Sequence, residues 1–252
     1  MPKFFVMSDI HGFYDEMIKS LDEAGFDKDN EQHWVVTCGD HFDRGNQPMQ
    51  VMEYLKSLPR KVLVRGNHED LFLEMCQRGY ACGHDISNGT AATIYDLSDV
   101  ESRYMFSICD SAYEKAKDFI YSMVNYFETK NYIFVHSWIP LKCNDDLPIY
   151  NIKNRQFEFN PNWREAHGVD WEQARWGNPF NLVEQGLLPD KTIVFGHWHC
   201  STGWAKSEGR SEYGHDAKFD PYFGDGFISI DACTAYSGKV NVVVLEDEFL
   251  ED

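Results

Sequence analysis

Residues 3–12 read KFFVMSDIHG, a short apolar run that is followed almost at once by Asp9 and His11. The run has the length and the aromatic and branched composition of a buried strand. The pattern recurs at residues 34–38 (WVVTC) and 61–64 (KVLV), and amphipathic segments that favour helices separate these runs. Such an alternation of strands and helices predicts a parallel sheet with helices packed against it.

The spacing of apolar residues indicates where the connecting helices lie. Residues 15–24 carry apolar side chains at helical spacing and are followed by Gly25, a common helix stop. Pro48 is well placed to open a second helix. We expect a third helix at about 70–79 and a long one with apolar residues at helical spacing over 112–127.

Strand-like runs return in the second half of the chain, at 132–135, 192–195, 227–230 and 240–245. Few helical segments separate the last three, so a second sheet of mixed or antiparallel strands is expected. Residues 141–190 are irregular and rich in Asn, Pro and Trp, and we interpret them as an insertion that frames a groove. No linker or repeat interrupts the pattern, which favours one domain over residues 1–252.

Composition narrows the classes of function. The 252 residues include 41 Asp and Glu against 23 Lys and Arg, a net charge of −18, which argues against stable binding to nucleic-acid phosphates. No apolar stretch approaches the length of a membrane span. The seven cysteines are scattered and form no CxxC pair, which is typical of reduced thiols and favours a cytoplasmic location.

Five strand-like runs each end in a polar cluster. Because the carboxyl ends of strands in an open α/β sheet gather along one edge, we expect these clusters to meet at one site. They supply carboxylate, imidazole and amide donors without thiolate, a set that suits Mn, Fe, Zn or Ni. The clusters are Asp9–His11, Gly39–Gly45, Arg65–Glu69, His136 and Gly196–His199.

These donors predict a reaction as well as a metal site. One aspartate shared by two ions would hold them about 3.5–4 Å apart, the spacing of two-metal hydrolases. Arg44 and Arg65 lie inside the clusters and can pair with phosphate oxygens through their planar forks. A histidine that binds no metal could protonate the leaving oxygen.

The order and spacing of these residues resemble those of the calcineurin-like metallophosphoesterases, and more narrowly the compact phage and bacterial branch of the phosphoprotein-phosphatase type. The resemblance is dense over residues 3–79 and thinner over 131–137 and 192–245. It implies an α/β fold in which two mixed sheets, flanked by helices, form an αββα sandwich. It is carried by Asp9-x-His11, Gly39-Asp40-x-x-Asp43-Arg44-Gly45, Gly66-Asn67-His68-Glu69, His136 and Gly196-His197.

The resemblance implies a role for each matched residue. Two divalent ions, Mn²⁺ foremost with Fe, Zn or Ni as alternatives, would bind, and a hydroxide bridging them would attack phosphorus in line. His68, oriented by Asp43, would act as general acid, and Arg44 and Arg65 would clamp the phosphoryl oxygens. The implied metal ligands are Asp9 and His11 for the first ion, Asp40 as the bridge, and Asn67, His136 and His197 for the second.

Several residues match less closely or depart from the pattern. His41 stands where the family usually has an apolar or aromatic residue. His199 is either a further ligand of the first ion, as in the wider metallophosphoesterase group, or a residue behind the ligands. Arg175 is either a third phosphate-facing arginine or a surface arginine stacked on Trp176. Tyr236 matches an aromatic residue that lines the phosphate site.

The resemblance leaves two enzymatic functions open. The first is hydrolysis of phosphomonoesters in proteins, on phospho-Ser/Thr with phospho-Tyr as a further substrate, or in small molecules. The second is a diadenosine tetraphosphate hydrolase or nucleotide phosphodiesterase on the same metals. Asp43 and Glu69 favour the first function, and His199 with the aromatic-rich insertion favours the second. A third alternative, a degenerate binding module, fits poorly with the intact metal-ligand motifs, and the oligomeric state stays open.

Overall fold

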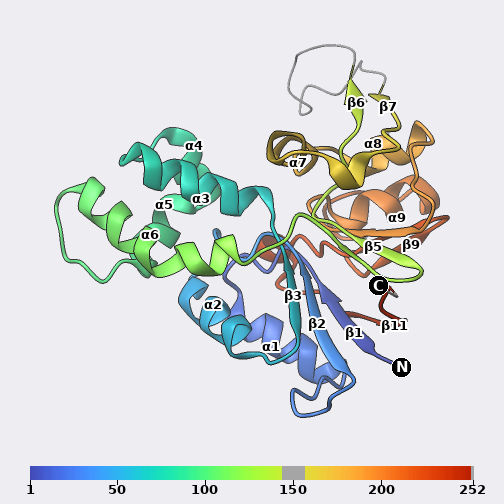
Figure 1. Cartoon of the computed structure of the whole chain (residues 1–252), viewed down its shortest axis with the longest axis horizontal. Coiled ribbons are helices and arrows are strands. Elements are labelled where there is room, and N and C mark those ends of the chain that lie inside the picture. The colour runs from blue at the N-terminus through green and yellow to red at the C-terminus, as the bar shows by residue number, and fades with distance from the viewer. Residues whose placement is uncertain (144–156, 251–252) are drawn as a thin grey trace.

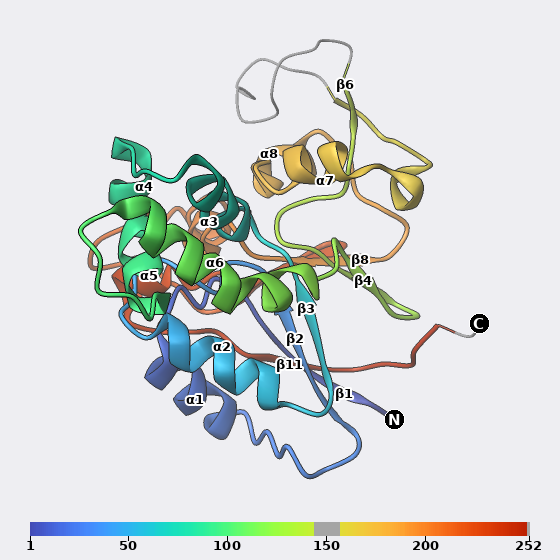
Figure 2. The ribbon, with the colours of Figure 1, turned by 60° about the vertical axis from the view of Figure 1, so that its left-hand side comes forward.

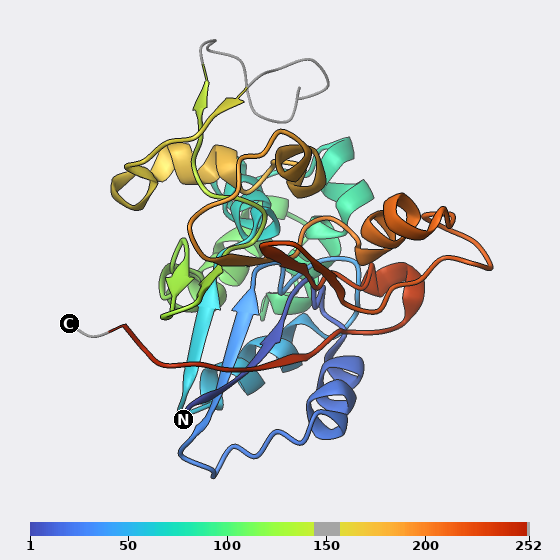
Figure 3. The same cartoon turned by 90° about the vertical axis from the view of Figure 1, so that its right-hand side faces the viewer.

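The computed structural model describes residues 1–143 and 157–250. Its first sheet has the strand order β11-β1-β2-β3. Strands β1 (Lys3–Met7), β2 (His33–Cys38) and β3 (Lys61–Val64) are parallel, and β11 (Val243–Glu246) is antiparallel to β1. Figure 3 shows β1, β2 and β3 pointing toward the same end of the sheet, the end that leads into the predicted site.

The second sheet has the order β4-β5-β8-β10-β9. Its three central strands, β5 (Tyr132–Phe134), β8 (Thr192–Phe195) and β10 (Phe227–Ser229), are parallel. The outer strands, β4 (Phe127–Glu128) and β9 (Tyr222–Gly224), run antiparallel to their neighbours. The expected mixed sheet is therefore confirmed.

Alternating side chains explain how the two sheets stack. Along β1, Phe4 and Val6 enter a core shared with strands of the second sheet, whereas Phe5 and Met7 enter the core under the helices. Strand β8 divides in the same way, with Val194 facing the first sheet. Because successive strand residues point to opposite faces, strands that are apolar throughout must be covered on both sides.

Helices cover the outer face of each sheet (Figure 1). Helices α7 and α8 pack on the second sheet, where Trp138, Trp163 and Trp171 form much of the core. Figure 2 shows α1 and α2 along the face of β1, β2 and β3. The helices on the first sheet are α1 (Tyr14–Glu23), α2 (Pro48–Ser57), α3 (Asn67–Arg78), α5 (Thr90–Leu97) and α6 (Met105–Tyr121). The remaining helices are α4 (Gly83–Asn88), the 3-10 helix η2 (Trp163–Glu165), α7 (Gly168–Ala174), α8 (Pro179–Glu184), α9 (Cys200–Glu208) and α10 (Thr234–Ser237).

The predicted αββα sandwich of two mixed sheets is confirmed, and β1, β2 and β3 are parallel as expected, but several details were wrong. Residues 240–245 were assigned to the second sheet, whereas β11 lies at the edge of the first. Helix α3 begins at Asn67 and not near Asp70, and α6 ends at Tyr121, before Phe127, which belongs to β4. The expected irregular insertion contains η2, α7, α8 and the small strand pair β6 (Lys142–Cys143) and β7 (Phe157–Glu158). Its residues 144–156 lie outside the described ranges.

Within residues 1–143 and 157–250, none of the helices combines the length and the apolar character needed to cross a membrane.

Candidate active site

The loops after five strands meet at one edge, as the sequence predicts. Backbone hydrogen bonds join them, from Asp9 to Gly39 (3.1 Å), from His11 to Asp40 (2.9 Å) and from Gly196 to His136 (2.8 Å). Seven non-glycine residues in the described ranges have positive φ, and six of them carry predicted roles: Asp9, His11, Asp40, Asp43, Arg44 and His197. Such backbone conformations each cost about 1 kcal/mol or more and cluster at functional sites.

A first group of side chains surrounds the ring of His11. Its Nε2 lies 3.8 Å from Asp9 Oδ1 and 3.7 Å from Asp40 Oδ2. Because Nδ1 lies 2.8 Å from the carbonyl oxygen of Phe42, Nδ1 carries the hydrogen and donates it, which leaves the Nε2 lone pair facing the carboxylates. This Nε2 is buried and has no hydrogen-bond partner. An orphaned nitrogen beside two carboxylates is the arrangement that a cation would complete.

A second group converges on the ring of His136. Its Nε2 lies 2.7 Å from Asn67 Oδ1, 3.2 Å from His197 Nδ1 and 3.4 Å from Asp40 Oδ1. Its Nδ1 lies 2.8 Å from the carbonyl oxygen of Cys38, so Nε2 is again the nitrogen with a free lone pair. The two oxygens of Asp40 thus face different groups, Oδ2 the first and Oδ1 the second. This is the geometry expected of a carboxylate that bridges two cations.

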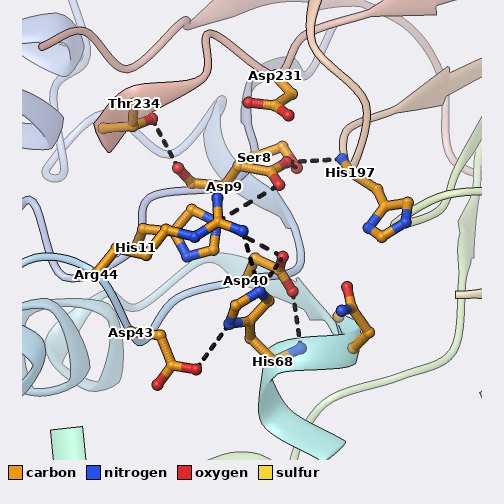
Figure 4. A network of polar contacts seen from close by, with 12 residues as sticks. Ser8, Asp9, His11, Asp40, Asp43, Arg44, His68, His197, Asp231 and Thr234 are labelled. Carbon is orange, nitrogen blue, oxygen red and sulfur yellow. Dashed lines mark hydrogen bonds and ion pairs between the residues drawn. The ribbon is translucent and has the colours of Figure 1, made fainter. Parts of the chain in front are cut away.

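The electrostatics of the site also suit cations. Burial raises the pKa of the Asp9 carboxyl, and the neighbouring Asp231 and Asp40 raise it further (Figure 4). Burial lowers the pKa of His11, with Arg44 and His68 adding to the effect, so its imidazole is neutral. Burial likewise lowers the pKa of His197. Neutral imidazoles among crowded carboxylates fit divalent metal ions, which would relieve the repulsion.

Glu69 holds the loop that carries Asp40. Its Oε2 accepts hydrogen bonds from the backbone N–H of Asp40 (3.1 Å) and of Gly66 (2.8 Å), and Oε1 accepts one from His41 N (2.8 Å). The ring of His41 lies between Glu69 and Thr37 and is fully buried. Burial raises the pKa of Glu69, but His41 and the N–H donors outweigh burial and hold that pKa well below its usual range. His41, unusual in sequence, therefore belongs to the support of the loop.

His68 lies beside the first group, on the first turn of α3. Its Nδ1 is 2.7 Å from Asp43 Oδ2, and its Nε2 is 3.8 Å from Asp40 Oδ2 and 3.3 Å from a terminal nitrogen of Arg44. Thr90 donates a further hydrogen bond to Asp43 Oδ2 (2.6 Å). Burial lowers the pKa of His68, but Asp40 and Asp43 outweigh burial and the pKa is raised. The pair has the geometry of an oriented, protonatable imidazole.

The structure corrects one reading of Arg175. Its side chain does not lie at the surface, because it is only 6% exposed and pairs through Nε with Asp70 Oδ2 at 2.7 Å. The other oxygen of Asp70 pairs with Arg65 at 2.6 Å. One carboxylate thus joins two of the predicted phosphate-binding arginines.

His199 and Tyr236 make their hydrogen bonds with residues outside the two groups. Nδ1 of His199 is 3.0 Å from the hydroxyl of Tyr213, and the described part of the chain places His199 in neither cluster of potential metal ligands. Tyr236 is 55% exposed, and its hydroxyl accepts a hydrogen bond from the N–H of Gly214. Their roles stay predictions.

Three supporting residues escaped the sequence analysis. Ser8 donates hydrogen bonds to Asp9 and to the carbonyl of Cys38, Thr90 fixes Asp43, and Asp70 joins the arginines. Asp70 directly follows the Gly66-Asn67-His68-Glu69 motif, so a search for buried polar residues that flank the motifs would have found it. Thr90 flanks none of the motifs.

Comparisons with known proteins agree with this site. Residues 2–216 match the model of the calcineurin-like phosphoesterase family. Over 66 residues, 26% of this chain, the sequence is 39% identical to a symmetrical bis(5'-nucleosyl)-tetraphosphatase of Salmonella paratyphi B, and the alignment covers 23% of that protein. A symmetrical bis(5'-nucleosyl)-tetraphosphatase of Salmonella typhi matches to the same extent. The chain thus spans about a quarter of the length of these curated relatives.

Solved structures show the same fold at low sequence identity. A cold-active protein-tyrosine phosphatase of a Shewanella species aligns with a TM-score of 0.55 and 16% identity, over 98% of this chain and 76% of that one. A protein assigned as a diadenosine tetraphosphatase aligns with a TM-score of 0.52 and 15% identity, over 97% and 91%. With the family model matched over most of its length and donors for two cations at its strand ends, the chain belongs to the calcineurin-like phosphoesterases, metal-dependent hydrolases of phosphoesters.

Proposed function

We propose that this chain is a phosphomonoesterase that uses two divalent cations, Mn²⁺ foremost, and acts on phospho-Ser/Thr in proteins. The observation that carries the proposal is the pair of His68 and Asp43, 2.7 Å apart, beside the carboxylate that faces both ligand groups. A monoester needs a proton for its leaving alkoxide, and an oriented imidazole at the metal edge supplies one.

The cations, when bound, would activate a water molecule and neutralise charge on the phosphoryl group. Eleven side chains of this chain account for the rest of the machinery. Asp40 places one oxygen toward each group, and His68 donates from Nε2 while Asp43 fixes its ring. Arg44, 3.3 Å from that Nε2, would pair with a phosphoryl oxygen when substrate enters. The proposed ligands are Asp9, His11, Asp40, Asn67, His136 and His197. The proposed phosphate-binding arginines are Arg44, Arg65 and Arg175.

The alternative is a dinucleoside tetraphosphate hydrolase. It is favoured by the local 39% identity to the Salmonella enzymes. That similarity covers only 66 residues. Because both functions use the same metal-ligand motifs, it supports the metal site more than a choice of substrate. The His68–Asp43 pair bears on the leaving group and favours the monoesterase.

Relative rates on three substrates test the proposal. Metal-stripped protein reloaded with Mn²⁺ is assayed on a phosphoserine peptide, on bis(4-nitrophenyl) phosphate and on diadenosine tetraphosphate. We expect kcat/KM for the peptide to be highest by about 100-fold, a difference of about 2.7 kcal/mol in transition-state stabilisation. A preference for the diester or the dinucleotide would overturn the assignment.

Two variants complete this experiment. Asn67→Ala removes a proposed ligand and should abolish turnover of every substrate. His215→Ala changes an exposed histidine that is none of the proposed ligands or phosphate-binding residues, and it should leave all three rates unchanged. Wild-type activity in Asn67→Ala would contradict the metal scheme itself.

A further inference from the structure

Asp70 has two oxygens, and each one holds a different arginine. Oδ1 lies 2.6 Å from a terminal nitrogen of Arg65, and Oδ2 lies 2.7 Å from Nε of Arg175. Asp70 is 6% exposed, so water competes little for these contacts. Asn125 Oδ1 accepts a further hydrogen bond from Arg175 at 3.1 Å. The two guanidinium groups are therefore fixed side by side by one carboxylate.

This cluster adjoins the second ligand group from two directions. Asp70 lies on the first turn of α3, the turn that also carries Asn67 and His68. On the other side, the ring of Trp176 is 6.2 Å from that of His197, and the carbonyl of Gly177 accepts a hydrogen bond from Ser137, the neighbour of His136. The segment after α7 is thus packed against the proposed ligands of the second cation.

The three side chains of this cluster carry a net positive charge. Two guanidinium groups share one carboxylate, which leaves one positive charge in excess. The Nε of Arg65 is buried and has no hydrogen-bond partner. A buried charged donor without a partner costs free energy. An apolar pair in the place of a buried ion pair would stabilise the fold equally well, so stability alone does not account for this cluster. The arrangement suits an anion that arrives from outside and accepts these donors.

We propose that Asp70 is a positioning residue that sets Arg65 and Arg175 together as a two-arginine clamp for the phosphoryl group. The inference rests on the proposed function, since it needs a phosphate group at this edge. Asparagine at position 70 would break the clamp selectively. Its single carbonyl oxygen can accept from one arginine, while its NH₂ group presents hydrogens to the other.

The test measures phosphate binding apart from turnover. Isothermal titration of Mn²⁺-loaded protein with orthophosphate gives a Kd, and 4-nitrophenyl phosphate gives KM and kcat. In Asp70→Asn we expect Kd and KM to rise together by about tenfold, the loss of roughly one charged hydrogen bond, with kcat changed less than about threefold. Mn²⁺ content should equal that of wild type. Asp70→Glu keeps two oxygens and should recover most of the binding.

A matched control separates positioning from general destabilisation. Asp85 is buried, pairs with Arg78 and belongs to neither cluster of potential metal ligands. Asp85→Asn should lower stability and leave Kd and KM unchanged.

The outcomes separate this inference from the proposed function. If the net charge of the site, and not the positions of the arginines, determines phosphate affinity, Asp70→Asn should bind phosphate as tightly as wild type or more tightly, because it removes a negative charge. That result would refute the clamp. If wild-type protein neither binds orthophosphate nor hydrolyses the monoester, the proposed function fails.

Discussion

Replacing Gly66 with alanine should displace the carboxylate that faces both ligand groups. A Cβ built on Gly66 would lie 2.2 Å from Asp40 Oδ1 and 2.4 Å from Asp40 N. Ordinary contacts between such atoms are roughly 3.4 Å or longer, so Asp40 must move by about 1 Å. A shift of the backbone here would break hydrogen bonds, because the Glu69 carboxylate accepts from the N–H groups of both Asp40 and Gly66.

The size of the effect follows from this displacement. A 1 Å error in the position of a reacting group costs about 100-fold in rate. Overpacking at a filled site costs about 1–3 kcal/mol of stability. We therefore expect Gly66→Ala to fold with a lowered melting temperature, to bind less Mn²⁺ and to hydrolyse 4-nitrophenyl phosphate about 100-fold more slowly than wild type.

Gly83→Ala and Gly168→Ala are the matched controls. No heavy atom lies within 4 Å of a Cβ built at either position, and each begins a helix. They should keep wild-type activity and gain up to about 1 kcal/mol of stability, since alanine restricts the unfolded chain. Thermal melts, Mn²⁺ content by mass spectrometry and initial rates are measured together. Full Mn²⁺ content and turnover in Gly66→Ala would refute the reasoning that the fit around Asp40 sets the metal site.

Two further changes test proton transfer and the packing of the sheets. His68→Gln should lower phosphomonoester turnover by about 100-fold or more, which is the usual contribution of a general acid. The variant should keep its bound Mn²⁺. A loss of Mn²⁺ would instead identify His68 as a ligand. Asp247→Asn should cost about 1–2 kcal/mol at pH 7 in urea unfolding, because Asp247 accepts hydrogen bonds from Thr129 and from the backbone and side chain of Asn131. Burial raises the pKa of Asp247, but these donors outweigh burial and the pKa lies below its usual value. Its contribution is therefore complete above about pH 4 and is lost as the pH falls through the folded-state pKa. The difference from wild type should shrink toward pH 3, and an equal loss at pH 3 and pH 7 would contradict this account.

The sequence was informative where a local rule governs. Strand β1 is apolar on both faces, and polar residues follow it directly, so both its burial and the place of Asp9 and His11 could be predicted. The same rule placed Asp40, because the carboxyl ends of parallel strands share an edge. The convergence of the strand-end clusters needed no knowledge of helix boundaries.

Local patterns failed where partners distant in sequence decide. The run that ends at Phe127 looked helical, but Val124 bridges to Val64 and Phe127 packs between the sheets, so the chain leaves the helix at Tyr121. Strand β11 alternates buried and exposed residues, a pattern that fits the edge of either sheet. Only its pairing with β1 places β11 in the first sheet. In the same way, the partner of Arg175 is Asp70, which lies 105 residues away in the sequence.

Helix α3 shows why an early start of the helix matters for function. The backbone N–H of His68 donates to Asp40 Oδ1 at 3.1 Å, and the positive end of the helix dipole favours that carboxylate. Successive helix residues point about 100° apart, so four neighbours on this turn reach four different partners. Asn67 meets the ring of His136, His68 meets Asp43, Glu69 holds the Asp40 loop and Asp70 holds the arginines. A loop at 67–70 would allow each side chain to move separately, whereas one helical turn fixes their relative directions. The chain therefore couples proposed metal binding, proton transfer and phosphate binding through a single rigid turn, and substitutions along it should be separable by which of these three readouts changes.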